Sequence, residues 1–209
     1  MNSTAKHSNP YPVTAVILAG GKGSRLQGRD KGLLYWQQHR IIDTLLHQVA
    51  PHVAEVLINA NRNRSIYATY GYPVISDTMA DFQGPLAGFA SAMTQASYSH
   101  ILTLPCDGPL ITSEYVKRMC RTLPQLSPTK IAVAHDGKQL QPIHALIPVT
   151  LLDHLQNFLK SGERKTKLWY TQHEILPIDF TDKPELFTNI NTPAQLATLQ
   201  NPGKGKHHV

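Results

Sequence analysis

Short apolar runs alternate with longer helix-like stretches along most of this chain, and that alternation limits the possible folds more than any other feature. The runs that we predict to be strands are residues 13–18, 55–59, 73–76, 100–105, 130–135, 143–147 and 175–179. The stretches that we predict to be helices are residues 39–50, 64–70, 85–96, 112–123 and 150–159. Because strands that alternate with helices form a largely parallel sheet covered on both faces, the sequence predicts an α/β fold.

Helical signals are clearest at two places. Within residues 85–96, four apolar residues follow the i, i+3, i+4, i+7 spacing of one helix face, namely Leu86, Phe89, Ala90 and Met93. Near the end of the chain, Thr192 is a good helix-capping residue, and Pro193 follows it at the first helical position. We therefore predict a last helix that starts at this pair.

The length of 209 residues suits one domain with a core large enough to fold without disulfides. No internal repeat or linker divides the chain. Residues 1–12 are polar and lack the apolar segment of a secretory signal, so we expect a flexible leader. Residues 13–200 are predicted to form one three-layer α/β domain with a mostly parallel, twisted sheet. Residues 201–209 are predicted to be a flexible basic tail.

Several features point to a cytoplasmic protein and exclude other classes. No apolar run approaches the ~20 residues that cross a bilayer, so we expect no contact with a membrane. The chain has two cysteines, Cys106 and Cys120, which lack metal-ligand spacing and are expected to be reduced thiols. The eleven histidines form no HExxH or HxxxH pattern, which disfavours a zinc enzyme.

The formal net charge of +6 favours an anionic partner, which could be nucleic acid or a phosphorylated small molecule. The chain has no long run of lysine and arginine, and no aromatic residues interleaved with basic ones. We therefore expect no binding to nucleic acid and favour a phosphorylated small molecule.

The loop after the first predicted strand is rich in glycine and cations. It reads LAGGKGSRL at residues 18–26 and is followed by Asp30-Lys31-Gly32. Leu26 stands where a GxGxxG motif needs its last glycine, and no GK[ST] sequence closes a Walker A loop. Glycines still let the backbone approach a phosphate closely, and Lys22, Arg25 and Lys31 add positive charge. The sequence therefore predicts phosphate binding here; the alternative is a flexible turn with solvated lysines.

Polar residues also end three other predicted strands, at Asn59, Asp77 and Asp107. In open α/β sheets, ligands bind outside the carboxyl ends of the strands. Mg²⁺ is commonly held by one or two carboxylates together with phosphate oxygens and water, which favours Asp107 as a metal ligand. Taken singly, however, Asp107 could cap a helix, and Asn59 and Asp77 could be ordinary turn residues.

Taken together, the motifs resemble a known family. The LAGGK loop with Arg25 and Asp30-Lys31 resembles that of nucleotidyltransferases that act on sugar phosphates and related phosphates. The other motifs are more particular: NANR at residues 59–62, GPLAG at 84–88, PCD at 105–107 and NINTP at 189–193. With them, residues 13–200 resemble the molybdenum cofactor guanylyltransferases. The resemblance implies a Rossmann-like nucleotidyltransferase domain.

The resemblance also implies a role for each position that matches a family motif. The positions matched to nucleotide contacts are Leu18, Ala19, Gly20, Lys31, Asn59, Asp77 and Asp107. The positions matched to the reacting phosphate are Arg25, Lys31 and Asp107, with Asp107 as the Mg²⁺ ligand. Two late positions are matched to the pterin or metal side, namely Asn189 and Asn191.

The reaction implied by the resemblance transfers GMP from GTP to the terminal phosphate of molybdenum-molybdopterin. The products are the molybdopterin guanine dinucleotide cofactor and pyrophosphate. A phosphate monoester is already ionised near neutral pH, so the reaction requires no general base from the protein. GTP and molybdopterin are the implied substrates, and molybdopterin-handling proteins and molybdoenzyme chaperones are the implied partners. We expect a monomer.

Three kinds of alternative remain open at this point. A sister enzyme could use CTP on the same pterin or make a sugar or polyol nucleotide, and comparing GTP with CTP would discriminate these cases. A non-catalytic carrier would bind the cofactor without releasing pyrophosphate. A nucleic-acid-binding protein would show a steep dependence of affinity on salt. All versions of the enzyme hypothesis require the glycine loop and Asp107 to lie at one site.

Overall fold

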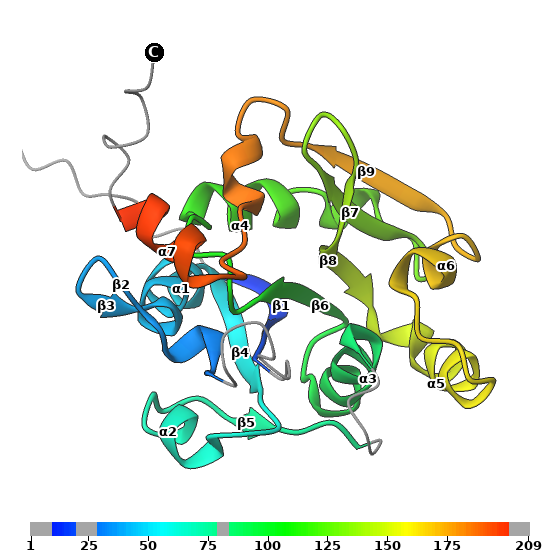
Figure 1. Ribbon diagram of the computed structural model, residues 1–209. Coiled ribbons are helices and arrows are strands. Elements are labelled where there is room, and N and C mark those ends of the chain that lie inside the picture. Colours follow the sequence, from blue (N-terminus) through cyan, green and yellow to red (C-terminus); the bar gives the residue numbers. More distant parts are fainter. Residues whose placement is uncertain (1–9, 20–28, 79–83, 201–209) are drawn as a thin grey trace, which may run out of the picture.

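The computed structural model describes residues 10–19, 29–78 and 84–200, and a seven-stranded sheet runs through its centre (Figure 1). Its strands are β1 (Tyr11–Leu18), β4 (Val53–Asn59), β5 (Val74–Ile75), β6 (His100–Pro105), β7 (Ile131–His135), β8 (Leu140–Pro148) and β9 (Ile175–Asp179). Their order across the sheet is β5-β4-β1-β6-β8-β7-β9. All seven correspond to the strands predicted from the apolar runs, with ends that differ by a few residues.

The sheet is mostly parallel, as predicted, and β8 is the exception. Strands β5, β4, β1 and β6 pair in parallel, and β7 pairs with β9 in parallel. β8 runs antiparallel to both of its neighbours. The connection from β7 to β8 is a tight turn in which the Asp136 N–H donates to the Gln139 carbonyl over 3.2 Å. Because no helix separates these two strands, the chain has to reverse direction there.

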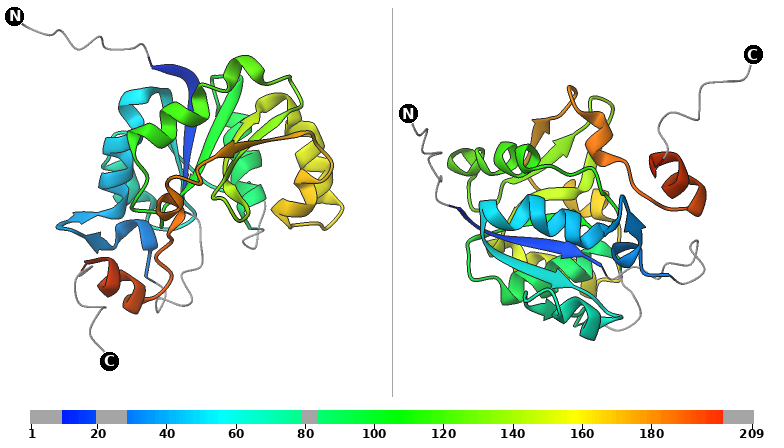
Figure 2. Two further views of the ribbon diagram at one scale, coloured as in Figure 1. Left: turned by 90° about the horizontal axis from the view of Figure 1, so that it is seen from above. Right: turned by 90° about the vertical axis from the view of Figure 1, so that its left-hand side faces the viewer.

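Helices cover both faces of the sheet and complete three layers (Figure 2). Helices α1 (Ile41–Val49) and α4 (Ser113–Cys120) pack on one face, and α3 (Pro85–Gln95), α5 (Leu152–Lys160) and α6 (Thr166–Tyr170) pack on the other. Strand β1 has apolar side chains on both faces of the sheet. Ala15 and Ile17 belong to the apolar cluster under α1 and α4, whereas Val16 belongs to the cluster under α3, α5 and α6. Successive side chains of a strand point to opposite faces, so a strand buried on both faces is apolar throughout.

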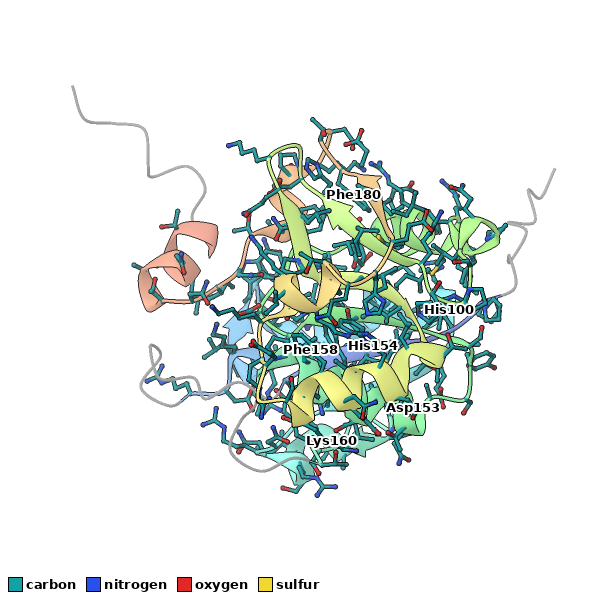
Figure 3. The ribbon with its side chains drawn as sticks, turned by 90° about the vertical axis from the view of Figure 1, so that its right-hand side faces the viewer. His100, Asp153, His154, Phe158, Lys160 and Phe180 are labelled. Carbon is teal, nitrogen blue, oxygen red and sulfur yellow. The ribbon has the colours of Figure 1, made fainter. Side chains whose placement is uncertain are left out.

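Helix α5 forms the outer surface of the second helical layer and packs on α3 (Figure 3). Phe158 is buried, whereas Asp153 and Lys160 of the same helix are exposed. Helix α3 contacts β1, β4 and β6 as well as α5, and every residue from Leu86 to Met93 is buried. The predicted apolar stripe is therefore part of a helix that is buried on more than one side.

Some predicted boundaries were wrong. The helix predicted at residues 39–50 begins only at Ile41, because a short strand, β3 (His39–Arg40), pairs with β2 (Tyr35–Trp36) in a hairpin. Gln37 and Gln38 form its turn with φ values of 46° and 71°. Positive φ at both central positions suits a two-residue hairpin turn, but glutamine is not a usual residue there, so the sequence carried no signal for it.

Other short elements were not predicted, among them the 3₁₀ helix η2 (Lys31–Leu33) and helix α6. The predictions of α2 (Arg64–Ala68) and α7 (Pro193–Gln200) are confirmed. Within the described residues, no helix is both long and apolar enough to cross a membrane. Cys106 and Cys120 are buried and form no disulfide with each other, as expected of reduced thiols.

Candidate active site

The strand order brings the predicted site residues to one edge of the sheet. The carboxyl ends of β5, β4, β1 and β6 lie side by side in that order. The residues at or just after these ends are Asp77, Asn59, Leu18-Ala19 and Asp107. Backbone hydrogen bonds extend this alignment past the strands. The Ala19 N–H donates to the Asn59 carbonyl over 2.7 Å, and the Cys106 N–H donates to the Leu18 carbonyl over 3.1 Å.

At the β6 end of this edge, Lys31 joins two other segments of the chain. Its Nζ lies 2.7 Å from Oδ2 of Asp107 and 2.5 Å from Oδ1 of Asn191. The side chains of Lys31 and Asp107 keep 24% and 13% of their exposure, so the ion pair is accessible to a ligand. A cation, a carboxylate and an amide from three distant parts of the sequence therefore meet at one point.

Two oxygen atoms next to this ion pair have unused hydrogen-bonding capacity. Oδ1 of Asp107 and Oδ1 of Asn189 are buried and have no hydrogen-bond partner within the described part of the chain. The Ile190 N–H donates to the backbone carbonyl of Asp107 over 2.9 Å, which docks the Asn189 segment onto the end of β6. Buried polar atoms without partners are uncommon in proteins, and a bound ligand or ion is one way to satisfy them.

The position of Asn191 is set by the start of α7. The backbone N–H groups of Asn191 and Thr192 donate to Oε1 of Gln195 over 2.7 and 3.0 Å, and the Gln195 N–H donates to Oγ1 of Thr192 over 3.2 Å. These reciprocal contacts form a capping box. Thr192 therefore caps the last helix as predicted, and the same contacts orient the turn that carries Asn191.

At the β4 and β5 end of the edge, three polar residues form a second group. Asp77 accepts hydrogen bonds from Nδ2 of Asn59 over 3.0 Å and from Nδ2 of Asn61 over 2.8 Å. The Asp77 N–H donates in turn to Oδ1 of Asn61 over 2.8 Å. Asn59 is buried, so this group is held firmly against the sheet.

Helix α3 approaches this edge closely because Gly88, within the helix, has no side chain. A Cβ atom at Gly88 would lie 2.7 Å from Oδ1 of Asn59 and 2.8 Å from a methyl carbon of Leu18. Gly84, which precedes the helix, has a φ of 79°, a conformation that favours glycine, and Pro85 follows at the first helical position. The GPLAG motif thus brings the start of α3, with its free N–H groups, against the ends of β1 and β4.

Comparison with known proteins shows to which family the chain belongs. Residues 15–175 match the family model described as MobA-like NTP transferase domain. The chain belongs to this family.

Individual relatives of this transferase extend over nearly its whole length. It is 44% identical over 187 residues to the molybdenum cofactor guanylyltransferase of Shewanella sediminis, and 43% identical over 187 residues to that of Shewanella woodyi. Each match covers 90% of this chain and 95% of the relative. Among solved structures, the molybdopterin-guanine dinucleotide biosynthesis protein A of Archaeoglobus fulgidus has a TM-score of 0.77 at 18% identity, and the match covers 91% of this chain and 98% of that one. That likeness confirms the Rossmann-like α/β fold.

Two of the predicted site residues of this transferase, Gly20 and Arg25, lie outside the described residues, as does Lys22. Their roles stay predictions. The described part of the loop nevertheless begins next to Asp107, because Leu18 is bonded to Cys106. The end of β1 therefore lies beside the segment that carries Asp107, and the proximity of the glycines themselves to Asp107 stays a prediction.

The structure also reveals two residues near the site that the sequence did not suggest, Tyr67 and Asn63, which both contact Asp30. Asp30 is buried, and its carboxylate accepts hydrogen bonds from the Tyr67 hydroxyl over 2.6 Å and from Nδ2 of Asn63 over 3.0 Å. Burial raises the pKa of the Tyr67 hydroxyl, which therefore stays protonated and able to donate. Residues 30 and 67 share no local motif, so only a search for buried donors to the Asp30 carboxylate could have suggested the pair.

Cys106 lies between the last residue of β6 and Asp107, but it is a poor candidate for catalysis. Burial raises the pKa of its thiol, and the nearby Asp107 charge raises it further. A thiol that stays protonated is a weak nucleophile and a weak metal ligand. Within the described residues no cluster of three or more histidine, cysteine or acidic side chains is suited to a metal. Lys31 and Asp107 therefore remain the predicted reactive groups at this edge.

Proposed function

We propose that this transferase moves GMP from GTP to the terminal phosphate of molybdenum-molybdopterin and releases pyrophosphate. The observation that carries this proposal is the meeting of Lys31, Asp107 and Asn191 at the end of β6, beside the Leu18-Ala19 backbone. The names of the relatives, which are 41–44% identical, support the choice of substrates.

The nucleotide is proposed to lie across the end of β1. Lys31 at the β6 side provides the positive charge that attracts phosphates, so the triphosphate lies there. The opposite side, with Asn59 and Asp77, offers amide and carboxylate groups suited to the nucleoside. The two groups flank Ala19, whose backbone lies between them.

Base selection is proposed to involve Asp77. Both of its carboxylate oxygens accept hydrogen bonds from asparagine amides, which hold the side chain in place, and each oxygen has a further lone pair. Guanine presents two adjacent N–H donors on its pairing edge, whereas cytosine presents a ring acceptor beside its amino group. A fixed carboxylate therefore favours guanine, because an acceptor placed against an acceptor is left unpaired.

The residues at the β6 end fit a divalent cation, which we propose to be Mg²⁺. Asp107 has one unpartnered, buried carboxylate oxygen, and Asn189 has a second unpartnered oxygen nearby. Mg²⁺ requires few protein ligands, because phosphate oxygens and waters complete its shell. When bound, such an ion neutralises charge on the phosphates. Asp107 would hold it, with Asn189 as a neighbouring oxygen donor.

Lys31 and the backbone align the reacting groups and stabilise the charge that develops during the transfer. The attacking phosphate oxygen is already ionised, so the protein has to align it with the α-phosphorus and the departing pyrophosphate. Lys31, fixed by Asp107 and Asn191, provides a positive charge at the place where negative charge accumulates. Arg25 is proposed to add a second charge near the transferring phosphate.

The test is a pyrophosphate-release assay with purified molybdenum-molybdopterin, Mg²⁺ and each of the four nucleoside triphosphates in turn. GTP should support turnover well above the other three. Preference for CTP would contradict the base assignment, and cofactor binding without pyrophosphate release would identify a carrier. Asp107→Asn, which removes the charge but keeps the shape, should lower kcat at least about a hundredfold. The exposed carboxylate variant Asp182→Asn is the matched control and should retain full activity.

We further propose that the enzyme acts as a monomer in the cytoplasm and passes its product to molybdoenzyme chaperones after receiving molybdopterin from proteins that handle it. The two buried, unpaired cysteines suit a reducing compartment. Size-exclusion chromatography with light scattering should give a mass near 23.2 kDa. A stable dimer at micromolar concentration would contradict the monomer.

A further inference from the structure

We propose that Tyr67 and Asn63 are positioning residues that hold Lys31 at the phosphate site and act through the buried carboxylate of Asp30. This inference rests on the proposed function for the role of Lys31, but the placement of Lys31 can be tested without any substrate. In the described part of the chain, the side chains of both residues donate to Asp30.

The Asp30 carboxylate is held by three neutral donors. Oδ1 accepts from the Tyr67 hydroxyl over 2.6 Å and from the Gly32 N–H over 3.2 Å. Oδ2 accepts from Nδ2 of Asn63 over 3.0 Å. Donors on both oxygens restrain the carboxylate in rotation as well as in position, and a buried charge needs such donors to be stable.

Asp30 is joined to Lys31 by more than the peptide bond. It caps η2, the 3₁₀ helix that begins at Lys31, through its side-chain bond to the Gly32 N–H. Its backbone carbonyl also accepts from the Leu33 N–H over 3.2 Å, and the Lys31 carbonyl accepts from the Leu34 N–H over 3.2 Å. The direction in which the Lys31 side chain leaves the backbone is therefore set by the capped turn.

The position of the Tyr67 side chain is fixed by the residues packed around it. It is completely buried in α2, and a Cβ atom at Gly32 would lie 2.6 Å from its hydroxyl oxygen and 3.2 Å from Cβ of Cys106. The tyrosine, the η2 turn and the residue before Asp107 are thus in contact around the absent side chain of Gly32. One tyrosine therefore fixes the turn that carries Lys31 relative to the segment that carries its carboxylate partner.

Asn63 has a backbone conformation consistent with this role. Its φ and ψ are 51° and 28°, the left-handed region that asparagine tolerates better than most residues. It stands at the N-cap of α2, where an asparagine side chain commonly accepts from the helix, but it makes no such capping bond. Its amide instead donates to Asp30, which lies 33 residues away in sequence.

The first test measures the accessibility of the Lys31 amine by acylation with a water-soluble reagent, followed by mass spectrometry of peptides. Tyr67→Phe removes only the hydroxyl and should raise the labelling rate of Lys31 severalfold. Lys130 is the internal reference, because it is also ion-paired, to Glu174 over 2.6 Å, and 23% exposed. Increased labelling of both lysines would indicate general loosening, and unchanged labelling of Lys31 would also overturn the inference.

A second variant and a matched control distinguish a specific effect on Lys31 from a folding defect. Asn63→Gly keeps the left-handed backbone conformation and removes only the amide, so it should act in the same direction as Tyr67→Phe. Tyr115→Phe removes the hydroxyl of another fully buried tyrosine, one that contacts His144 instead. It should leave Lys31 labelling at the wild-type rate, and an equal increase there would contradict a specific role for Tyr67.

The second test is a double-mutant cycle in the pyrophosphate-release assay. Tyr67→Phe should lower kcat/KM about tenfold in the wild-type background and less than about twofold when combined with Lys31→Ala, because Lys31 is then no longer there to be positioned. Full additivity would mean that Tyr67 acts independently of Lys31 and would overturn the inference. If the wild-type protein released no pyrophosphate, the proposed function would fail, while the labelling result would still decide the positioning role.

Discussion

Among single residues, Lys31 joins the most distant segments of the candidate site. Its ammonium group is hydrogen-bonded to Asp107 and Asn191, so a single side chain connects the segment after β1, the end of β6 and the turn before α7. Lysine suits this place because its ammonium is a compact charge with donors that can rotate. A partly exposed cation beside a carboxylate can exchange partners when a phosphate group arrives.

At this scale we predict that Lys31→Ala lowers kcat/KM for GTP by about a hundredfold to a thousandfold, because it removes a positive charge from the place where negative charge develops. Steady-state pyrophosphate release at varied GTP concentration measures the effect. Lys130→Ala, which removes an ion-paired lysine elsewhere on the surface, is the control and should leave kcat/KM unchanged. Wild-type kinetics in Lys31→Ala would refute the assignment.

At the scale of elements, the site depends on how closely a helix and a turn approach the sheet. Helix α3 reaches the ends of β1 and β4 because Gly88 has no side chain to separate them. The turn before α7 is fixed by the capping box of Thr192 and Gln195. In both cases a local feature of a helix determines where a polar group of the site lies.

We predict that Gly88→Ala weakens GTP binding severalfold and lowers the free energy of unfolding by about 1–3 kcal/mol, because the new methyl group would overlap with Asn59 and Leu18. The better helix propensity of alanine offsets part of this, by about 1 kcal/mol. Isothermal titration with GTP and urea unfolding measure the two effects. The control is Thr94→Ala, an exposed position on the same helix. Unaltered GTP affinity in Gly88→Ala would show that α3 does not shape the site.

A second prediction at this scale concerns the capping box. Gln195→Ala removes the acceptor for the Asn191 and Thr192 N–H groups, so the turn should lose its fixed conformation. We expect about 0.5–2 kcal/mol less stability for α7 and a rise in KM for the pterin substrate. Amide hydrogen exchange over α7 and substrate titrations report these changes. Gln195→Glu retains the acceptor and should behave like the wild type.

At the scale of the whole molecule, the order of the strands creates the site. Because β5, β4, β1 and β6 are parallel neighbours, the residues at their carboxyl ends form one row, with the groups proposed to bind the nucleoside at one end and those proposed to bind the phosphates at the other. The apolar clusters on both faces keep this row rigid, since both helical layers are packed against it. The rest of the sheet, from β8 to β9, extends the core and carries none of the predicted site residues.

The stability of the whole molecule should depend on pH through His144. This imidazole is buried between Tyr115 and Phe187, and burial lowers its pKa from 6.5 to about 3. Between these two values the unfolded chain binds a proton that the folded protein does not, so stability falls as the pH decreases through this window. The slope from this residue approaches about 1.4 kcal/mol per pH unit.

Urea unfolding at pH 7, 6, 5 and 4 tests this prediction. His144→Leu should be less stable at pH 7, because the Tyr115 hydroxyl loses its neighbour, but its stability should decline less steeply with acid. The exposed His47 provides the control, since His47→Ala should leave the slope unchanged. An identical slope for His144→Leu and the wild type would mean that His144 does not contribute to acid sensitivity.

The sequence alone was sufficient for the class of fold, and it pointed to most of the residues that the structure brings together at the candidate site. The apolar runs and helical spacings are local patterns, so they indicated all seven strands of the main sheet and the start of α7. Asn59, Asp77 and Asp107 lie at or just after strand ends, and parallel strands bring their carboxyl ends to one edge, whereas Lys31 belongs to the motif that follows β1. Local patterns cannot indicate a contact between two residues that are far apart in the sequence when one of them belongs to no motif.

Tertiary structure alone decided the antiparallel direction of β8, the hairpin at Gln37 and Gln38, and the support of Asp30 by Tyr67 and Asn63. It also decided that Lys31 lies against Asn191, 160 positions away along the chain. The reason is physical: spacing along the chain encodes which face a residue occupies, whereas the partner of a buried polar group depends on which segments pack together. A buried carboxylate requires donors, but its sequence neighbours do not reveal which segment will provide them.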